Sequence, residues 1–312
     1  MATVGCAVAA LALIAVPAAA AKRPTCFGKR ATIVGSNHRD HITGTSNSDV
    51  IVGRGGSDVI EGEGGYDTIC GGSGNDRIFD MNSPDKLIGG PGDDFLKDLG
   101  GNDLLVGDNA SASGVATGPT GRDVLKGARG SDFMVGDNYA VKGTASGASH
   151  DVLSSNNGKA DVIVGDSASL RGDASGGASD TTYGEEGKDL VVGDSYSRRG
   201  HASGGGDDTL NAGPKTDVVV GDSYTVTGLA TGSGHDKLHG WYGNDTLYGD
   251  DFAASPQGRA VGGAIDVVNG GNGNDRLFGG PMRDICGGST GDDGAGPDCE
   301  VRVKIEYMLH QP

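Results

Sequence analysis

The sequence is poor in aromatic residues, proline and positive charge. Aromatic residues make up 5% of the 312 positions, prolines number 10, and Lys plus Arg reach 25 against 42 acidic residues. The shortage of positive charge argues against a nucleic-acid-binding protein, which needs a basic surface for phosphates. A collagen-like chain is excluded because proline is scarce and glycine does not recur at every third position.

Glutamate is also scarce, whereas glycine and aspartate are abundant. Only six of the 42 acidic residues are Glu, so 36 are Asp, and 60 residues are Gly. A helical bundle is disfavoured because each Gly in a helix interior costs about 1 kcal/mol relative to Ala. The formal charge of −17 would favour disorder in a chain of low hydrophobicity. A folded chain of this composition therefore needs something to offset its charge.

Residues 1–21 are predicted to be a cleaved export signal. Residues 2–21 carry no charged side chain, and the apolar run from about residue 7 to 16 is followed by Pro17 and alanines. An uncleaved membrane anchor is the alternative. Removal of the signal leaves four cysteines, an even number that indicates disulfides in an exported chain. We favour Cys26–Cys70 and Cys286–Cys299, each fastening one end, with the other pairings and free thiols left open.

The remaining chain is dominated by a nine-residue repeat. Aspartates recur every nine residues without a break at Asp40, Asp49, Asp58, Asp67, Asp76, Asp85, Asp94 and Asp103. The second residue after each of them is Ile or Leu. Each unit supplies a Gly-rich turn and a three-residue strand with one inward side chain, as the alternation along a strand requires. One apolar residue per strand cannot form a core alone, so the strands must stack as an array.

A longer repeat of 28 or 29 residues follows. Gly-Asp pairs begin at residues 107, 136, 165, 193, 221 and 249. Each copy contains two Asp-x-apolar units, at Asp123 and Asp132, Asp151 and Asp161, Asp180 and Asp189, Asp208 and Asp217, and Asp236 and Asp245. The nine-residue step then returns at Asp266, Asp275 and Asp284, and the apolar position of these later units fails only at Thr182 and Cys286. We expect three strands in each long copy.

These patterns predict an all-β fold, a parallel β-roll or β solenoid of stacked short strands and Gly/Asp-rich turns. We expect a leader at 22–34, a regular roll at 35–106, and a solenoid with a 28-residue period at 107–265. Further nine-residue units would occupy 266–293, and a terminal strand would cap the roll at 294–312. The segment 31–35 would open the roll.

Alternate aspartates would form rows along two edges of such a roll. Carboxylates repeated at the strand spacing of about 4.8 Å repel each other unless a cation lies between them. Several hard oxygen ligands in flexible turns favour Ca²⁺ over Mg²⁺. Soft metals are unsupported because the cysteines and histidines are not clustered.

The units 53–61 (GRGGSDVIE), 62–70 (GEGGYDTIC) and 71–79 (GGSGNDRIF) resemble the G-G-x-G-x-D-x-U-x nonapeptide of RTX, or haemolysin-type, calcium-binding repeats. The resemblance covers about residues 35–293. It implies that several Ca²⁺ ions lie between successive turns, held by Asp side chains and Gly carbonyls. The implied ligands are Asp40, Asp49, Asp58, Asp67, Asp76, Asp94, Asp103, Asp123, Asp132, Asp151, Asp161, Asp180, Asp189, Asp208, Asp217, Asp236, Asp245, Asp266, Asp275 and Asp284, with Gly53, Gly55, Gly62, Gly64 and Gly71.

Some positions depart from the RTX pattern. The unit 80–88 (DMNSPDKLI) lacks the glycines, which makes a site at Asp85 doubtful, and Asp98 replaces Gly at the start of a later unit. The role of the Asp in each Gly-Asp pair, from Asp108 to Asp250, is left open between ligand and turn-capping residue.

These features predict a secreted calcium-binding structural protein without catalysis. The first alternative is a surface or matrix protein that presents a calcium-rigidified face to a glycan, and the second is an RTX-class hydrolase. We find no catalytic constellation. The histidines lack metalloprotease spacing, and the G-x-S-x-G match at 287–291 is expected by chance in a chain rich in Gly and Ser. Calcium ions are the expected partners, with no nucleic acid and no membrane span once the signal is removed.

Overall fold

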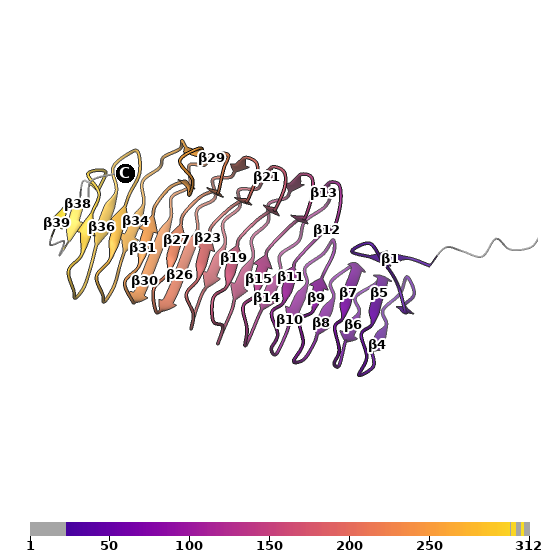
Figure 1. Cartoon of the computed structure of the whole chain (residues 1–312). Helices are drawn as coiled ribbons and strands as arrows, with labels where there is room; N and C mark the ends of the chain where they lie inside the picture. The colour runs from indigo at the N-terminus through magenta and orange to yellow at the C-terminus, as the bar shows by residue number, and fades with distance from the viewer. Residues whose placement is uncertain (1–22, 300, 304–306, 309–312) are drawn as a thin grey trace, which may run out of the picture.

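The chain forms one long stack of β-coils. The structure is a computed structural model that describes residues 23–299, 301–303 and 307–308, so the predicted export signal lies outside the described residues. No α-helix occurs in these ranges, and consequently none of their segments is a helix that could span a membrane. Figure 1 shows the N-terminal coils at one end of the stack and the C-terminal coils at the other.

Two long parallel sheets face each other along the stack. One has 12 strands, in the spatial order β38-β36-β34-β30-β26-β22-β18-β14-β10-β8-β6-β4, and the other has 13, in the order β3-β5-β7-β9-β11-β15-β19-β23-β27-β31-β35-β37-β39. The strands of the first sheet are β4 (His41–Thr43), β6 (Val59–Glu61), β8 (Arg77–Phe79), β10 (Phe95–Lys97), β14 (Val124–Lys126), β18 (Val152–Ser154), β22 (Thr181–Tyr183), β26 (Thr209–Pro214), β30 (Lys237–Tyr242), β34 (Val267–Asn269), β36 (Ile285–Gly287) and β38 (Val301–Val303). Those of the second are β3 (Ile33–Val34), β5 (Val50–Gly55), β7 (Thr68–Ser73), β9 (Lys86–Ile88), β11 (Leu104–Val106), β15 (Phe133–Val135), β19 (Val162–Val164), β23 (Leu190–Val192), β27 (Val218–Val220), β31 (Thr246–Tyr248), β35 (Arg276–Phe278), β37 (Gly294–Ala295) and β39 (Tyr307–Met308). The all-β parallel roll predicted from the sequence is confirmed.

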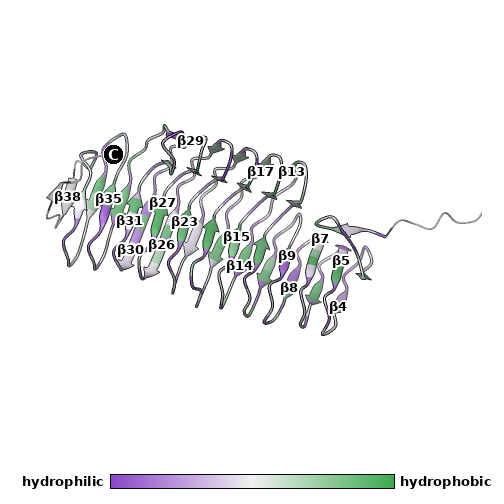
Figure 2. Cartoon of the chain, in the orientation of Figure 1, coloured by the Kyte–Doolittle hydropathy of each residue, from purple (hydrophilic) through white to green (hydrophobic). Residues whose placement is uncertain are grey.

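The inward position of each nine-residue unit forms the core. Leu96 pairs in register with Ile78 on one side and Leu125 on the other, and Leu105 pairs with Leu87 and Met134. All six of these side chains are fully buried. Figure 2 shows the apolar residues gathered on the strands and the polar residues in the turns. Stacking therefore gives each single apolar side chain the neighbours that its own strand lacks.

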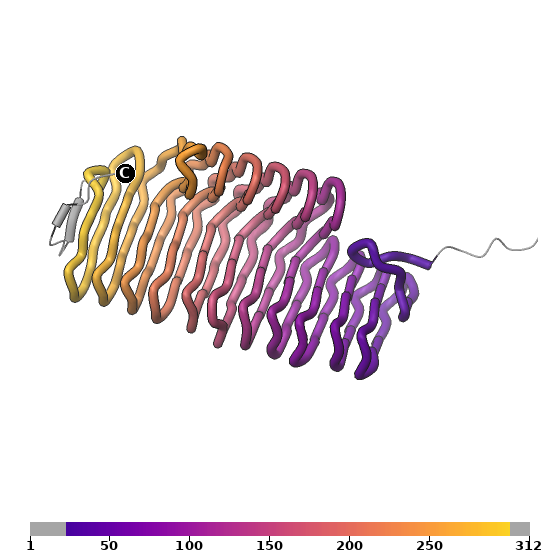
Figure 3. Tube along the Cα trace, in the orientation of Figure 1, coloured from indigo at the N-terminus to yellow at the C-terminus, as the bar shows by residue number. Residues whose placement is uncertain are grey.

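The long copies contain four strands, so the expectation of three is wrong. Two further six-stranded parallel sheets lie along one edge of the stack, where Figure 3 shows the widened coils. Their strands are β12 (Ala110–Ser111), β16 (Tyr139–Ala140), β20 (Ala168–Ser169), β24 (Tyr196–Ser197), β28 (Tyr224–Thr225) and β32 (Phe252–Ala253), and β13 (Ala116–Thr117), β17 (Ala145–Ser146), β21 (Ala174–Ser175), β25 (Ala202–Ser203), β29 (Leu229–Thr231) and β33 (Arg259–Ala260). The inserted segment turns back on itself between two very short strands, because small buried residues such as Ala140 and Ala145 let them approach closely.

Aromatic residues pack between the 13-stranded sheet and the inserted strands. Tyr196 stacks on Tyr224 at 5.4 Å, and Tyr248 stacks on Phe252 at 4.1 Å and on Phe278 at 4.9 Å. Ring pairs at these separations add about 0.5–1.5 kcal/mol beyond the area that they bury. The few aromatic residues of the chain thus reinforce the part of the roll that carries the insertions.

Both ends of the roll are fastened by disulfides. Cys26, in the hairpin of β1 (Thr25–Cys26) and β2 (Lys29–Arg30), is bonded to Cys70, and Cys286 is bonded to Cys299. These are the two pairings favoured from the sequence. The segment 31–35 opens the roll as expected, through β3. The C-terminal tail forms two short strands, β38 and β39, which add to opposite sheets, and so it is not one terminal strand.

We expect Leu96→Ala to lower the free energy of unfolding by about 2–5 kcal/mol, because it leaves a cavity in the inward column. Val115→Ala is the control, since the Val115 side chain is 63% exposed; its effect should stay within about 0.5 kcal/mol. Urea unfolding in calcium-containing buffer measures both. Equal effects of the two substitutions would contradict the assignment of the core.

Candidate metal centre

The turn aspartates form two continuous ladders, one along each edge of the roll. The backbone N–H of Asp58 donates to Oδ1 of Asp76 at 2.7 Å, and the same bond joins each ladder member to its counterpart in the next coil. The first ladder runs through Asp40, Asp58, Asp76, Asp94, Asp123, Asp151, Asp180, Asp208, Asp236, Asp266 and Asp284. The second runs through Asp49, Asp67, Asp85, Asp103, Asp132, Asp161, Asp189, Asp217, Asp245, Asp275 and Asp293.

The ladders contain every aspartate that the sequence analysis named as a ligand. They also contain Asp85, which was considered doubtful, and Asp293, which was not considered. Alternate aspartates lie on opposite edges, as their spacing predicts.

One oxygen of each inner ladder carboxylate is buried without a partner. Oδ1 of Asp76 accepts the N–H of Asp58, whereas Oδ2 has no hydrogen-bond partner and the residue is 1% exposed. The same holds for Oδ2 of Asp58, Asp67, Asp85, Asp94, Asp103, Asp123, Asp132, Asp151, Asp161, Asp180, Asp189, Asp208, Asp217, Asp236, Asp245, Asp266 and Asp275. Buried charges in proteins are paired with an opposite charge or coordinate a metal. In the part of the chain that the structure describes, no Lys, Arg or His forms an ion pair with these carboxylates.

The outermost coil differs from the others. The Asp40 carboxylate accepts the N–H of Ser36 at 2.6 Å, and Oδ2 of Asp49 accepts both the N–H and the hydroxyl of Thr45. The Ser36 backbone bond lowers the pKa of Asp40 below its usual range. These two aspartates, expected as ligands, therefore act as turn caps in this structure.

Glycines bring backbone carbonyls next to the unpartnered oxygens. A Cβ atom at Gly71 would lie 2.3 Å from Oδ2 of Asp76 and 2.8 Å from the Gly89 carbonyl oxygen, so only glycine fits there. Gly53 is equally crowded by Asp58 and by the Gly71 carbonyl oxygen, and Gly62 is crowded by a carboxylate. In contrast, no Asp carboxylate lies within 4 Å of the Cβ position of Gly55 or Gly64. Carboxylate and carbonyl oxygens together form the donor set that Ca²⁺ prefers.

A family model of the RTX calcium-binding nonapeptide repeat matches residues 34–69, 43–78, 81–110, 115–138, 203–223, 229–253 and 261–295. The chain belongs to this repeat family. No curated protein matches it. The coils between residues 139 and 202 lie outside the matched segments, yet their ladder aspartates are bonded in the same way as in the matched RTX units.

Two clusters of three carboxylates occur where the RTX pattern is broken. Asp67, Asp80 and Asp85 offer ligand oxygens within 4.8 Å of one another, and so do Asp85, Asp98 and Asp103. Asp80 and Asp98 stand where other RTX units begin with Gly. The Asp80 carboxylate occupies the space beside Gly62, and Asp80 and Asp98 each have a buried Oδ2 without a partner.

The sequence analysis did not name Asp80 or Asp98 as ligands, and it considered a site at Asp85 doubtful. It treated the replacement of Gly by Asp at these unit starts as the loss of a glycine and did not consider the carboxylate that the Asp adds. The available signal was an Asp at the first position of two units that share one edge of the roll.

Burial raises the pKa of the ladder carboxylates. It raises the pKa of Asp76 to about 7, of Asp94 to about 9 and of Asp123 to about 10. Neighbouring carboxylates add to this effect, Asp58 at Asp76 and Asp108 at Asp123. The metal-free RTX roll thus binds protons more tightly than the unfolded chain does.

Because these pKa values are raised on folding, protonation stabilises the metal-free roll. The contribution of Asp76 to the free energy of unfolding is complete when the pH lies below its ordinary pKa of 3.8, and it is lost as the pH rises through about 7. The contribution of Asp94 is lost as the pH rises through about 9. In chelator, we therefore expect more strand signal at pH 5 than at pH 8. Far-ultraviolet circular dichroism measures it. A strand signal that rises with pH in chelator would contradict the burial of the ladders.

Proposed function

We propose that this chain is an exported, non-catalytic structural module whose folding depends on calcium bound between the turns of its RTX repeats. The observation that carries the proposal is the buried, unpartnered carboxylate oxygen that recurs from coil to coil in both ladders. The ligands would be the inner ladder aspartates together with glycine carbonyls such as those of Gly71 and Gly89. Bound calcium would supply positive charge between stacked carboxylates. Asp80 and Asp98 would add a third carboxylate at two of the sites.

Simple binding arithmetic supports coupling between calcium and folding. At a free calcium concentration ten times the Kd, each site that exists only in the folded state stabilises it by about 1.4 kcal/mol. Extracellular calcium modules bind with Kd values of roughly 10⁻⁴–10⁻³ M. Several such sites together match the ~5–15 kcal/mol net stability of a typical domain. The chain would then stay unfolded at low intracellular calcium and fold after export.

Two further features support export and a non-catalytic role. Two disulfides fit an oxidising compartment. Ser289, the centre of the G-x-S-x-G match, lies exposed in a turn after β36. A hydrolase nucleophile of this type needs a helix directly after the turn, and no helix exists among the described residues.

An aromatic cluster favours a second function, the binding of a neutral glycan. Tyr183, Trp241 and Tyr242 are 40%, 53% and 58% exposed and line a hollow of 330 Å³ with Pro214. The Trp241 backbone has a φ of 70°, a strained value for a bulky residue, and its Nε1–H donates to Asn211 at 3.3 Å. Aromatic side chains offer flat apolar faces to sugar rings. The net charge of −17 disfavours acidic polysaccharides.

We expect chelation to abolish the strand signal of the mature protein in circular dichroism, and millimolar calcium to restore it. Asp94→Asn should raise the calcium concentration at the folding midpoint severalfold, because it removes a charged ligand. The control is Asp93→Asn, since Asp93 is exposed and bonds the N–H of Arg122 through one oxygen that Asn retains. A full strand signal in chelator at pH 8 would refute the dependence on calcium.

For the glycan, the chain contains a single tryptophan, so its fluorescence reports on Trp241 alone. Neutral hexose oligosaccharides such as cellohexaose and maltoheptaose should shift its emission. Tyr242→Ala should weaken the response about tenfold, whereas Tyr66→Ala should not, because the 64%-exposed Tyr66 lies in a different turn. No shift with any neutral oligosaccharide at millimolar concentration would exclude this second function.

A further inference from the structure

A third column of aspartates lies inside the widened coils. It consists of the Asp of each Gly-Asp pair, Asp108, Asp137, Asp166, Asp194, Asp222 and Asp250, where the chain leaves the 13-stranded sheet for the inserted strands. The N–H of Asp137 donates to the carbonyl oxygen of Asp166 at 3.0 Å, and that of Asp166 donates to the carbonyl oxygen of Asp194 at 3.1 Å. The column is therefore stacked in register like the two ladders.

The carboxylates of this column are more deeply buried than most ladder members. The first five are 0% exposed, and Asp250 is 4% exposed. Each accepts one N–H from the returning end of the inserted segment, for example Gly206 to Asp194 at 3.0 Å and Gly234 to Asp222 at 2.8 Å. That bond closes the widened coil. The other carboxylate oxygen has no partner in Asp108, Asp166, Asp194, Asp222 and Asp250.

Further oxygen atoms line the same column. A Cβ at Gly204 would lie 1.7 Å from the Gly176 carbonyl oxygen and 2.5 Å from Cβ of Asp194, so stacked glycine carbonyls run beside the carboxylates. On the other side lies the first ladder. A Cβ at Gly193, the residue before Asp194, would lie 2.1 Å from Oδ2 of Asp208. Carboxylates and glycine carbonyls are thus brought together here as they are in the repeat turns.

Among the described residues, no Lys, Arg or His forms an ion pair with this column. Burial raises the pKa of Asp108 to about 9 and that of Asp222 to about 8, with Asp137 and Asp251 as the next causes. After burial, the neighbouring Asp137 carboxylate also raises the pKa of Asp108 and of Asp166. Two states satisfy such a row, namely shared protons or bound cations.

We propose that the third column binds a row of Ca²⁺ ions inside the widened coils, together with carboxylates of the first ladder. The proposal rests on the proposed calcium-dependent function. Its residues lie in the inserted segments, at positions that are not the Asp of the nonapeptide. Calcium is favoured over protons because the donors are hard oxygens, carboxylates from two rows and backbone carbonyls, and because extracellular calcium is abundant at neutral pH.

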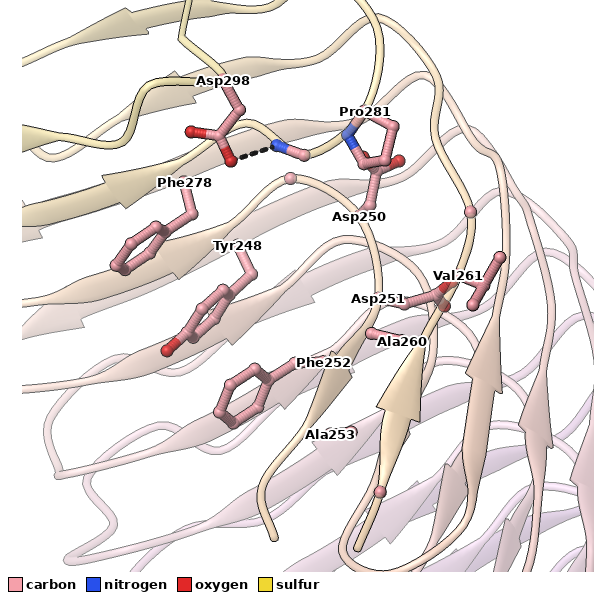
Figure 4. A pocket seen from close by; sticks show the side chains of 14 residues that line it. Tyr248, Asp250, Asp251, Phe252, Ala253, Ala260, Val261, Phe278, Pro281 and Asp298 are labelled. Carbon is pink, nitrogen blue, oxygen red and sulfur yellow. Dashed lines mark hydrogen bonds between the residues drawn. The ribbon is translucent and has the colours of Figure 1, made fainter. Parts of the chain in front are cut away.

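The C-terminal end of the column opens to solvent. Asp250 and Asp251 lie on the wall of a 490 Å³ hollow, which forms because the coils after β33 carry no inserted strands. Figure 4 shows Asp250 beneath Pro281 and Asp251 beside Val261, with Asp298 accepting the N–H of Gly280 at 3.1 Å on the same wall. Asp251 also has a buried oxygen without a partner. This hollow gives Ca²⁺ ions a route to the end of the third column.

The test compares ion counts in the mature protein. We expect the Asp166→Asn/Asp194→Asn variant to bind fewer Ca²⁺ ions than the wild type in equilibrium dialysis at 2 mM calcium. Its folding midpoint should also shift severalfold towards higher calcium. Each Asn retains the oxygen that accepts the N–H of Ala178 or Gly206. The matched control is Asp173→Asn/Asp207→Asn, two exposed aspartates of the same coils that bond the N–H groups of His201 and His235.

Each outcome decides the question. An ion count equal to that of the wild type, with equal or higher stability, means that the column is a row of shared protons and overturns the proposal. A wild type that binds no calcium refutes the proposed function itself. Should the double variant fail to fold, Asp108→Asn at the N-terminal end of the column is counted instead, and an unchanged ion number there overturns the proposal equally.

Discussion

The structure depends on one repeated interaction, the hydrogen bond from the backbone N–H of a turn aspartate to the carboxylate of the aspartate in the next coil. A hydrogen bond to an ionised acceptor is roughly twice as strong as a neutral one. It also fixes register, because each carboxylate faces only its counterpart, as Asp76 faces Asp58 and Asp94 faces Asp76. The same bond, however, stacks like charges along the whole roll. The hydrogen bond that holds the coils in register therefore also brings their like charges together.

This origin explains why the two ends of the roll differ from its middle. A carboxylate in the middle has one oxygen bound to the N–H before it and one oxygen left over. At the first coil, Ser36 and Thr45 bond to Asp40 and Asp49 directly. Disulfides then fasten the terminal segments to the stack, Cys26 to Cys70 at one end and Cys286 to Cys299 at the other. Local bonds and covalent links thus replace stacking where stacking stops.

The fold and the two ladders were predictable from the sequence because they depend on spacing alone. An Asp every nine residues with Ile or Leu two positions later specifies both the turn and the inward side chain. Spacing does not show the path of a segment that lacks this motif. The inserted strands, and the aromatic rings packed against them, were therefore missed. Asp80 and Asp98 were missed for another reason, since a substitution that breaks a consensus was counted as a loss although its carboxylate points at neighbouring carboxylates.

The insertions also make the two edges of the roll unequal. On the second ladder, which keeps plain turns, burial raises the pKa of Asp161 to about 6 and that of Asp217 to about 7. On the first ladder, which the inserted strands cover, burial and the adjacent column raise the pKa of Asp151 and Asp180 far above their usual range. The same motif is therefore more strongly desolvated on one edge, solely because a segment outside the motif folds over it. Since a desolvated carboxylate needs its counter-charge more, the covered edge must depend on cations more than the open edge.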